Sequence, residues 1–149
     1  MMGFKVCSSA FSEGDYLPAW YCGDCLNASP PLGWDGEPEA TVSLAVVCRS
    51  SAGNVHWLMW NVPNTLKTVY GKQPKEGKLP DGSYQGVNDF GEVGWTGPSG
   101  RKEGMSVTIT LYALDRMLDL SDPGANSEKL MSAMKGHVID ETSLTCACS

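Results

Sequence analysis

Cysteines form the most reactive pattern in this sequence. Four of the six lie in two close pairs, Cys22-Gly-Asp-Cys25 and Cys146-Ala-Cys148. Such thiols serve as redox pairs or, four together, as zinc ligands. The prolines at 30–31 prevent a helix that would lower the thiol pKa after Cys25, which disfavours thioredoxin-like chemistry. We retain a thiol-dependent redox or zinc-binding protein using these four residues as the alternative interpretation, beside free thiols or a disulfide.

His56 is the histidine with the more functional setting. It lies in an apolar segment beside Trp57 and Trp60, next to a turn at 49–54. At a pocket mouth, an imidazole would act as a hydrogen-bond donor or an acid–base group. Within a core, it would be a hydrogen-bonded structural residue. His137, directly after a predicted helix, is interpreted as structural or superficial.

The motifs of several enzyme classes are absent. The chain has no Gly-x-Ser-x-Gly elbow and no glycine-rich phosphate loop. A hydrolase using Ser50 or Ser51 with His56 would need an oriented third group, which the sequence does not show. Asn88-Asp89-Phe90-Gly91 is similar to the metal-binding triplet of kinases, but the other kinase motifs are missing.

The charge balance excludes further partners. The 149 residues include seventeen acidic and eleven basic side chains, which give a net charge of −6. Nucleic acids and anionic membrane surfaces require the opposite balance. We expect no transmembrane segment, because no apolar run reaches the ~18 residues needed to cross a bilayer. The start lacks the apolar stretch of a signal peptide, so a cytoplasmic location is expected.

Strands dominate the elements that must position these residues. Apolar and β-branched runs predict strands at 41–49, 55–63, 106–114 and 143–148. Period two places Val55, Trp57, Met59 and Asn61 on one face of the second strand and His56, Leu58, Trp60 and Val62 on the other. In the third strand it places Val107, Ile109 and Leu111 on one face and Thr108, Thr110 and Tyr112 on the other. Residues 64–105 are glycine-rich and predict a long irregular excursion of the kind that is usually functional.

One convincing helix lies between the last two of these strands. Pro123 stops the preceding chain, Asn126 or Ser127 can cap, and Gly136 suits the end. Its apolar stripe consists of Leu130, Ala133 and Met134. A weaker helical turn is predicted around 115–120. The whole indicates a mainly β fold, a sandwich with a few peripheral helices, as a single domain over 1–149.

Several strings, taken in order, carry a resemblance to one family. They are Gly14-Asp-Tyr-Leu-Pro18, Tyr21-Cys22, Asn27-Ala-Ser-Pro-Pro-Leu-Gly-Trp34, Ser43-Leu-Ala-Val-Val47, His56-Trp57, Asn61-Val-Pro63, Gln85-Gly-Val-Asn-Asp-Phe-Gly91, Gly94-Trp-Thr-Gly-Pro98, Leu111-Tyr-Ala-Leu-Asp115 and Met134-Lys-Gly-His137. From about residue 11 to 144, the chain resembles the phosphatidylethanolamine-binding protein family in its bacterial Raf-kinase-inhibitor-like branch. The resemblance implies a large antiparallel sheet, a smaller sheet and a small pocket for anions such as phosphate or a phospholipid head group.

By position, the resemblance assigns the pocket to His56, Gly97 and Pro98. His56 would donate a hydrogen bond to an anion oxygen, more strongly if the imidazole is charged. Gly97 would let its backbone lie close to the ligand, and Pro98 would fix the wall. Asp89 and Trp95 would support the rim.

Two departures from the family pattern predict a degenerate anion pocket. The usual Asp-Pro-Asp-x-Pro is replaced by residues 49–53, and Gly-x-His-Arg-Tyr by residues 104–107. The second histidine, the arginine and the aspartates are therefore missing. The terminal cysteines also depart from the pattern and suggest a disulfide between their strand and the loop at Cys22 and Cys25.

We expect a non-enzymatic binding module with no cofactor. Its ligand would be a small anion or a phospholipid head group. A regulatory protein partner and a homodimer are further expectations. A fourth hypothesis is a scaffold with a vestigial pocket that makes contacts through its exposed loops.

Overall fold

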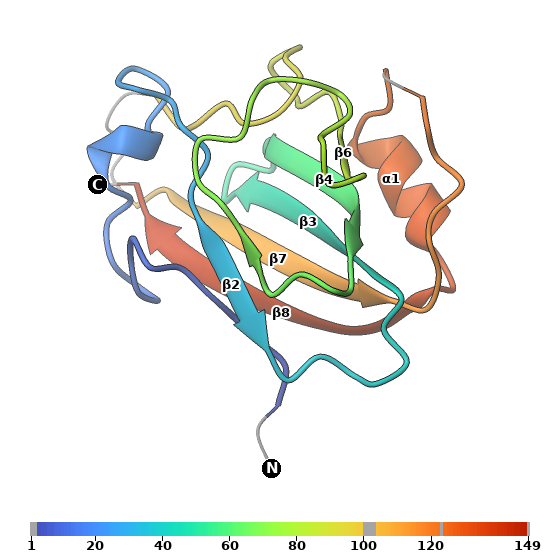
Figure 1. Ribbon diagram of the computed structural model, residues 1–149. Coiled ribbons are helices and arrows are strands. Elements are labelled where there is room, and N and C mark those ends of the chain that lie inside the picture. Colours follow the sequence, from blue (N-terminus) through green and yellow to red (C-terminus); the bar gives the residue numbers. More distant parts are fainter. Residues whose placement is uncertain (1–2, 100–103, 123, 149) are drawn as a thin grey trace.

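Two antiparallel sheets form the body of the protein. The computed structural model describes residues 3–99, 104–122 and 124–148 (Figure 1). The large sheet has the strand order β6-β4-β3-β7-β8. Its strands are β3 (Ser43–Ser50), β4 (Val55–Pro63), β6 (Tyr84–Gln85), β7 (Ser106–Leu114) and β8 (Val138–Ala147). The small sheet, β1-β2-β5, consists of β1 (Lys5–Cys7), β2 (Leu32–Asp35) and β5 (Thr68–Val69). The mainly β, two-sheet prediction is confirmed.

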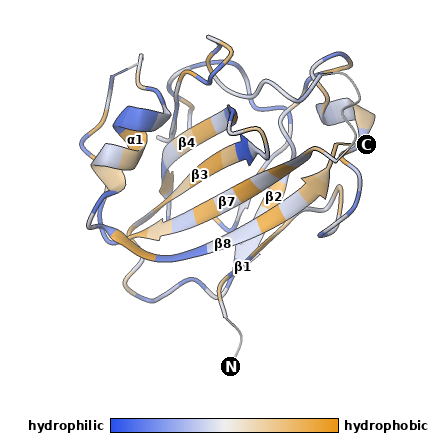
Figure 2. Cartoon of the chain, turned by 180° about the vertical axis from the view of Figure 1, so that it is seen from behind, coloured by the Kyte–Doolittle hydropathy of each residue, from blue (hydrophilic) through white to orange (hydrophobic). Residues whose placement is uncertain are grey.

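The main core lies between the two sheets. Side chains from one face of the large sheet meet Trp34 of β2 and Trp95 from a loop in one buried cluster. Strand β7 contributes Val107, Ile109 and Leu111, which are fully buried, as the predicted alternation requires. Figure 2 shows the apolar bands on β3, β4 and β7 that produce this packing. Burial of these bands sets the strand register, because a one-residue slip would turn each apolar face outward.

Helix α1 (Ser127–Met134) covers part of the opposite face of the large sheet. Leu130 and Met134 are buried in a second cluster with Leu58 and Trp60 of β4. The Asn126 side chain caps the helix by accepting a hydrogen bond from the Lys129 amide. The helix prediction is confirmed, and Gly136 follows it with a left-handed φ of 83°. Pro123 lies outside the described residues.

A β-bulge places His56 at the start of β4. Arg49 of β3 pairs with Val55 and Cys48 pairs with Trp57, so one extra residue, His56, lies between the two pairs. The bulge moves Val55 from its predicted face to the α1 side of the sheet. Bulges of this kind re-aim a side chain and are common beside functional sites.

A second bulge near the end of β4 reverses the predicted faces again. Leu44 pairs with Val62 and Val46 pairs with Met59, which leaves an extra residue in β4. Asn61 has a left-handed φ of 56° there, and Val62 joins the core between the sheets. The period-two prediction for β4 is therefore wrong at both ends of the strand and correct in its middle.

Two other predictions require correction. The segment 115–120 forms no helical turn, because Asn61 holds Leu118 by two hydrogen bonds: its Nδ2 donates to the Leu118 carbonyl and its Oδ1 accepts from the Leu118 amide. The last strand begins at Val138 rather than 143, because it pairs with β7 along most of its length. In the described part of the chain, no helix is long and apolar enough to cross a membrane.

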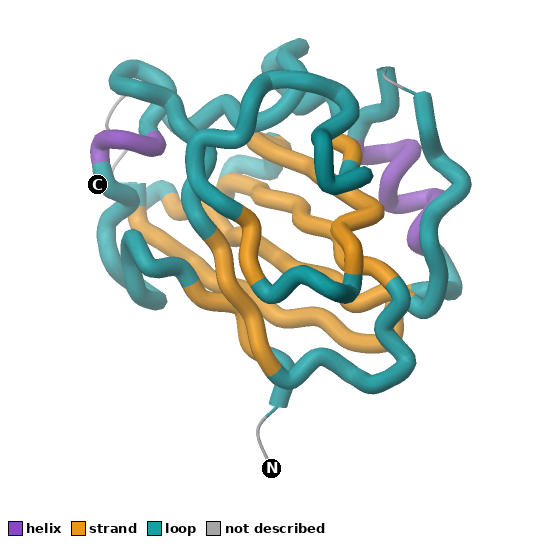
Figure 3. The backbone as a smooth tube through the Cα atoms, viewed as in Figure 1, coloured by secondary structure: helices purple, strands orange, loops and turns teal. Residues whose placement is uncertain are grey.

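The excursion over 64–105 is mostly irregular, as predicted. Within its described residues, 64–99 and 104–105, only the short strands β5 and β6 interrupt it, and Figure 3 shows its loops beside the segment around residues 19–28. The 3-10 turn η1 (Ala19–Tyr21) lies within that segment. These loops position the candidate site.

Candidate functional site

His56 and the loop at 94–98 lie in direct contact, although 40 positions separate His56 from Thr96. The His56 Nδ1 lies 2.7 Å from the Thr96 carbonyl oxygen, and the Thr96 amide donates to the His56 carbonyl at 3.0 Å. Since a carbonyl can only accept, the Nδ1 carries the hydrogen. The ring is 2% exposed, and its Nε2 is buried without a hydrogen-bond partner.

The protonation state of His56 follows from this burial. Desolvation lowers the pKa of His56 below its ordinary value, while the hydrogen bond to Thr96 and the charge of Asp89 act in the opposite direction. The imidazole is therefore neutral at pH 7, with a bare lone pair on Nε2. Its Nε2 can donate to an anion only after taking up a proton, so the charged form, which would strengthen the expected hydrogen bond, is not the resting state.

Phe90 and Asp89 close the site from the other side. The Phe90 ring lies 4.9 Å from the His56 ring, centroid to centroid, and is tilted by 45°. Phe90 is 46% exposed, and its ring covers the imidazole on the side that faces solvent. Asp89 attaches this loop to β4 by two hydrogen bonds. Its Oδ2 accepts a hydrogen bond from the Val55 amide at 2.7 Å, and its own amide donates one to the Val55 carbonyl.

Asn88 holds the loop together and was missed by the sequence analysis. Its buried Nδ2 donates to the Gly94 carbonyl at 3.0 Å and to Thr96 Oγ1 at 2.9 Å. Its Oδ1 accepts from the amides of Phe90 and Glu92. One side chain thus joins the loop that carries Phe90 to the loop that contacts His56. An Asn inside a glycine-rich string was the available signal, since Asn commonly bonds to nearby backbone.

Gly97 and Pro98 are fixed to the loop at 21–27. The Gly97 amide donates to Asn27 Oδ1 at 2.7 Å, and the Gly23 amide donates to the Pro98 carbonyl. A Cβ at Gly97 would lie 1.9 Å from the Tyr21 carbonyl oxygen. The missing side chain of Gly97 therefore admits a neighbouring backbone, and its amide is already bonded. A contribution of Gly97 or Pro98 to ligand binding stays a prediction.

Trp95 lies beneath this loop. It is 2% exposed, its indole packs edge-to-face on Trp57 at 5.7 Å, and its Nε1 donates to the Tyr21 carbonyl at 3.0 Å. The structure places Trp95 where it supports the wall from the core. A contribution of Trp95 or Asp89 to a ligand-binding rim stays a prediction.

The serines near His56 are engaged in the β3–β4 turn. Ser50 Oγ accepts from the Asn54 amide, and Ser51 Oγ accepts from the Ser106 amide. Because His56 Nε2 bonds to no described group, neither serine forms the hydrogen bond that would activate it as a nucleophile. The hydrolase hypothesis gains no support from this geometry.

The thiols are free, and burial raises the pKa of four of them, Cys22, Cys48, Cys146 and Cys148. No disulfide joins any of the six cysteines. Burial raises the pKa of Cys22 and of Cys148, and raises that of Cys146 to about 12. Redox and zinc chemistry require the thiolate, which these surroundings disfavour. Among residues 3–99, 104–122 and 124–148, no three His, Cys, Asp or Glu side chains gather closely enough to hold a metal ion. The thiol alternative and the suggested disulfide are therefore not supported.

Comparison with known proteins identifies the family. The model of the phosphatidylethanolamine-binding protein family matches residues 7–149. The UPF0098 protein of Methanothermobacter thermautotrophicus is 41% identical over 139 residues, which cover 91% of each chain. The UPF0098 protein YbhB of Escherichia coli is 31% identical over 156 residues, covering 95% of this chain and 97% of its own.

Solved structures agree with this assignment. Escherichia coli YbcL, described as a member of the mammalian PEBP family, superimposes with a TM-score of 0.88 at 26% identity, covering 97% of both chains. The PEBP homolog CT736 of Chlamydia trachomatis gives a TM-score of 0.85 at 25% identity, covering 97% of this chain and 95% of its own. The sheet arrangement, the family model and the relatives agree. The chain belongs to the phosphatidylethanolamine-binding protein family.

Proposed function

We propose that this protein is a non-enzymatic binding module that holds a phosphate-like anion at His56. The observation that carries the proposal is the buried, unpartnered Nε2 of His56. A buried polar atom without a partner costs stability and calls for an explanation, and a ligand that bonds to it supplies one. Family membership supports a binding module of this type.

The neutral imidazole dictates how the anion binds. Nε2 can accept a hydrogen bond from the P–OH of a monoanionic phosphate, or it can take up a proton and donate to the dianion. In both cases the complex holds one more proton than neutral histidine and dianionic phosphate hold separately. The second histidine and the arginine of the family pattern are missing, so one imidazole nitrogen carries the affinity and weak binding is expected.

The ligand chemistry is that of a phosphate group, whether free or part of a phospholipid head. Titration with inorganic phosphate and with O-phosphoethanolamine, followed by NMR of the His56 ring, compares these two sources. Both ligands are expected to shift the His56 signals. Tighter binding of O-phosphoethanolamine would favour a head group. A regulatory protein partner, a homodimer and a cytoplasmic location stay predictions.

The decisive variant is His56→Asn. Asparagine places its Nδ2 near the position of Nδ1, so it preserves the bond to Thr96 while removing the group at Nε2. Phosphate affinity should fall about tenfold or more, the worth of one charge-assisted hydrogen bond. His137→Asn is the matched control, because His137 is paired with Asp115 at 2.9 Å away from this site. Unchanged affinity in His56→Asn, or no binding to the native protein, would overturn the proposal.

A further inference from the structure

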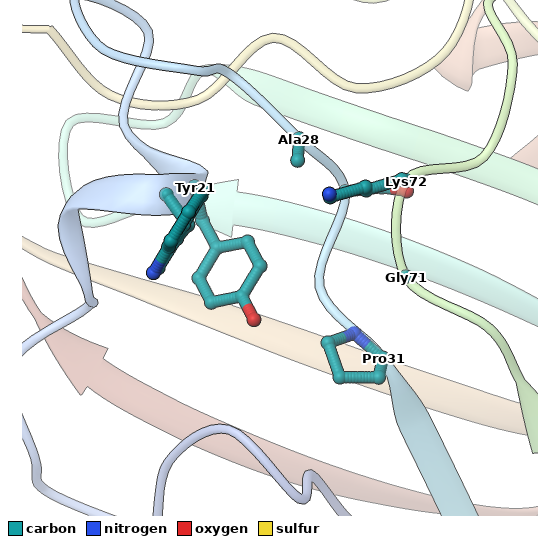
Figure 4. A pocket seen from close by; sticks show the side chains of 7 residues that line it. Tyr21, Ala28, Pro31, Gly71 and Lys72 are labelled. Atoms are coloured by element: carbon teal, nitrogen blue, oxygen red, sulfur yellow. The ribbon is translucent and has the colours of Figure 1, made fainter.

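A hollow opens between the η1 segment and the turn that follows β5. Its volume is about 310 Å³. Its walls are formed by Trp20, Tyr21, Ala28, Ser29, Pro31, Gly71 and Lys72. Figure 4 shows Lys72 extending from one wall and the Tyr21 hydroxyl pointing toward Pro31 from another. None of the five residues predicted for the anion site lines it.

Ser29 fixes the wall that carries Lys72. The Ser29 carbonyl accepts from the Lys72 amide at 2.9 Å, and its Oγ accepts from the Gln73 amide at 2.8 Å. These bonds hold Lys72 in a left-handed backbone conformation, φ 58°, which is unfavourable for a residue other than glycine. A Cβ at Gly71 would approach Pro31 and the Ser29 carbonyl to 3.2 Å, so the turn packs tightly. Strain that the surroundings enforce in this way is concentrated at ligand-binding positions.

The hollow combines one cation with aromatic walls. The Lys72 Nζ lies 5.7 Å from the centroid of the Trp20 ring. Trp20 is 55% exposed, a large fraction for an indole. Lys72 takes part in none of the ion pairs between described residues. In a protein with net charge −6, this ammonium therefore faces an aromatic surface and solvent, and it can receive an anionic group.

We propose that this hollow is a binding site for a small aromatic carboxylate. The carboxylate would pair with Lys72, and its ring would pack against Trp20 and Tyr21. The volume suits such a ligand, since a cavity of about 150 Å³ accepts benzene and ligand pockets begin near 300 Å³. A single ammonium matches a single negative charge, and the flat walls match a ring.

Benzoate and indole-3-acetate are the probes, and benzamide and indole-3-acetamide are their uncharged counterparts. Protein-observed NMR should show shifts of the amides of Ala28, Ser29 and Gly71 with the acids. Affinity for the amides should be about tenfold weaker, because the charge-assisted contact is lost. Cyclohexanecarboxylate, which retains the charge without the aromatic ring, should also bind more weakly.

Variants separate this site from the rest of the protein. Lys72→Gln should weaken benzoate binding about tenfold and Lys72→Arg should preserve it. Lys78→Gln is the matched control, because Lys78 also lies over an aromatic ring, Tyr84 at 5.6 Å, outside the hollow. Trp20→Ala should weaken binding, and the exposed position of Trp20 makes the variant compatible with folding. Equal affinity for benzoate and benzamide, no shift of these amides, or loss of binding in His56→Asn but not in Lys72→Gln would overturn the proposal.

Discussion

Binding of an anion at His56 should be coupled to uptake of one proton. Sulfate is the sharpest probe, because it remains a dianion across the neutral range and has no proton to offer. It can bond to Nε2 only after the imidazole is protonated, and burial lowers the pKa of His56 in the free protein. Sulfate affinity should therefore fall as pH rises, by about tenfold per pH unit above the His56 pKa, the linkage value for one proton.

The same proton gives the free protein the opposite pH dependence. A histidine whose pKa is lowered on folding binds its proton more readily in the unfolded chain. The folded state should thus lose stability as pH falls through the ordinary histidine pKa of about 6.5, with a slope of at most about 1.4 kcal/mol per pH unit. Saturating sulfate should oppose this loss. Urea unfolding between pH 8 and pH 5, with and without sulfate, measures both effects.

His56→Asn should remove both dependences, because asparagine does not titrate. His137→Asn should retain the sulfate dependence, since His137 pairs with Asp115 on another part of the surface. A sulfate affinity that is constant from pH 6 to pH 8 would refute the assignment of Nε2 as the anion contact. A pH dependence that persists in His56→Asn would place the titrating group elsewhere.

Three further predictions follow from particular contacts. Gly97→Ala should lower the free energy of unfolding by about 3 kcal/mol in urea melts, because the added Cβ would overlap a backbone carbonyl of the neighbouring loop. In the control Gly33→Ala, the added Cβ has no contact closer than 3.6 Å, and the change should stay within about 1 kcal/mol. Equal effects of the two substitutions would contradict the overlap at Gly97. Asn61→Ala should cost about 2–3 kcal/mol, since it loses two hydrogen bonds and retains a left-handed φ; calorimetry with no shift in Tm would contradict this account. In alkylation followed by mass spectrometry, Cys25 should react early and Cys146 only in denaturant; early labelling of Cys146 would show that the strand is open.

The three central strands of the large sheet, β3, β4 and β7, were predictable because their pattern reports burial directly. Strand β4 was placed at its observed bounds, and the alternation in β7 matches the packing of Ile109 and its neighbours. The bulges in β4 were not predictable from periodicity. They depend on the partner strand and on tertiary bonds, such as those from Asn61 to Leu118, that local pattern does not contain.

The candidate site, like the sheet, was predictable only in part. The approach of His56 to the 94–98 loop, expected from the resemblance, is observed as two hydrogen bonds to Thr96. The supports of that loop were not expected: Asn27 acts on the Gly97 amide, 70 residues away, and Asn88, whose bonds to that loop are local, was not singled out. Gly97 was singled out for its missing side chain, but its contact with the Tyr21 carbonyl was not expected. Its position beside Tyr21 could be established only once both loops had been placed.

The charge state of His56 connects the departures in sequence to the chemistry of the site. The turn at 49–53 lacks the two aspartates of the family pattern, and a carboxylate near an imidazole raises the pKa of that imidazole. Asp89 is the acidic side chain that raises the pKa of His56, but burial lowers this pKa by more. In this chain we expect anion binding at His56 to require one proton, carried by the anion or taken up by the imidazole, so the affinity should depend on pH near neutrality.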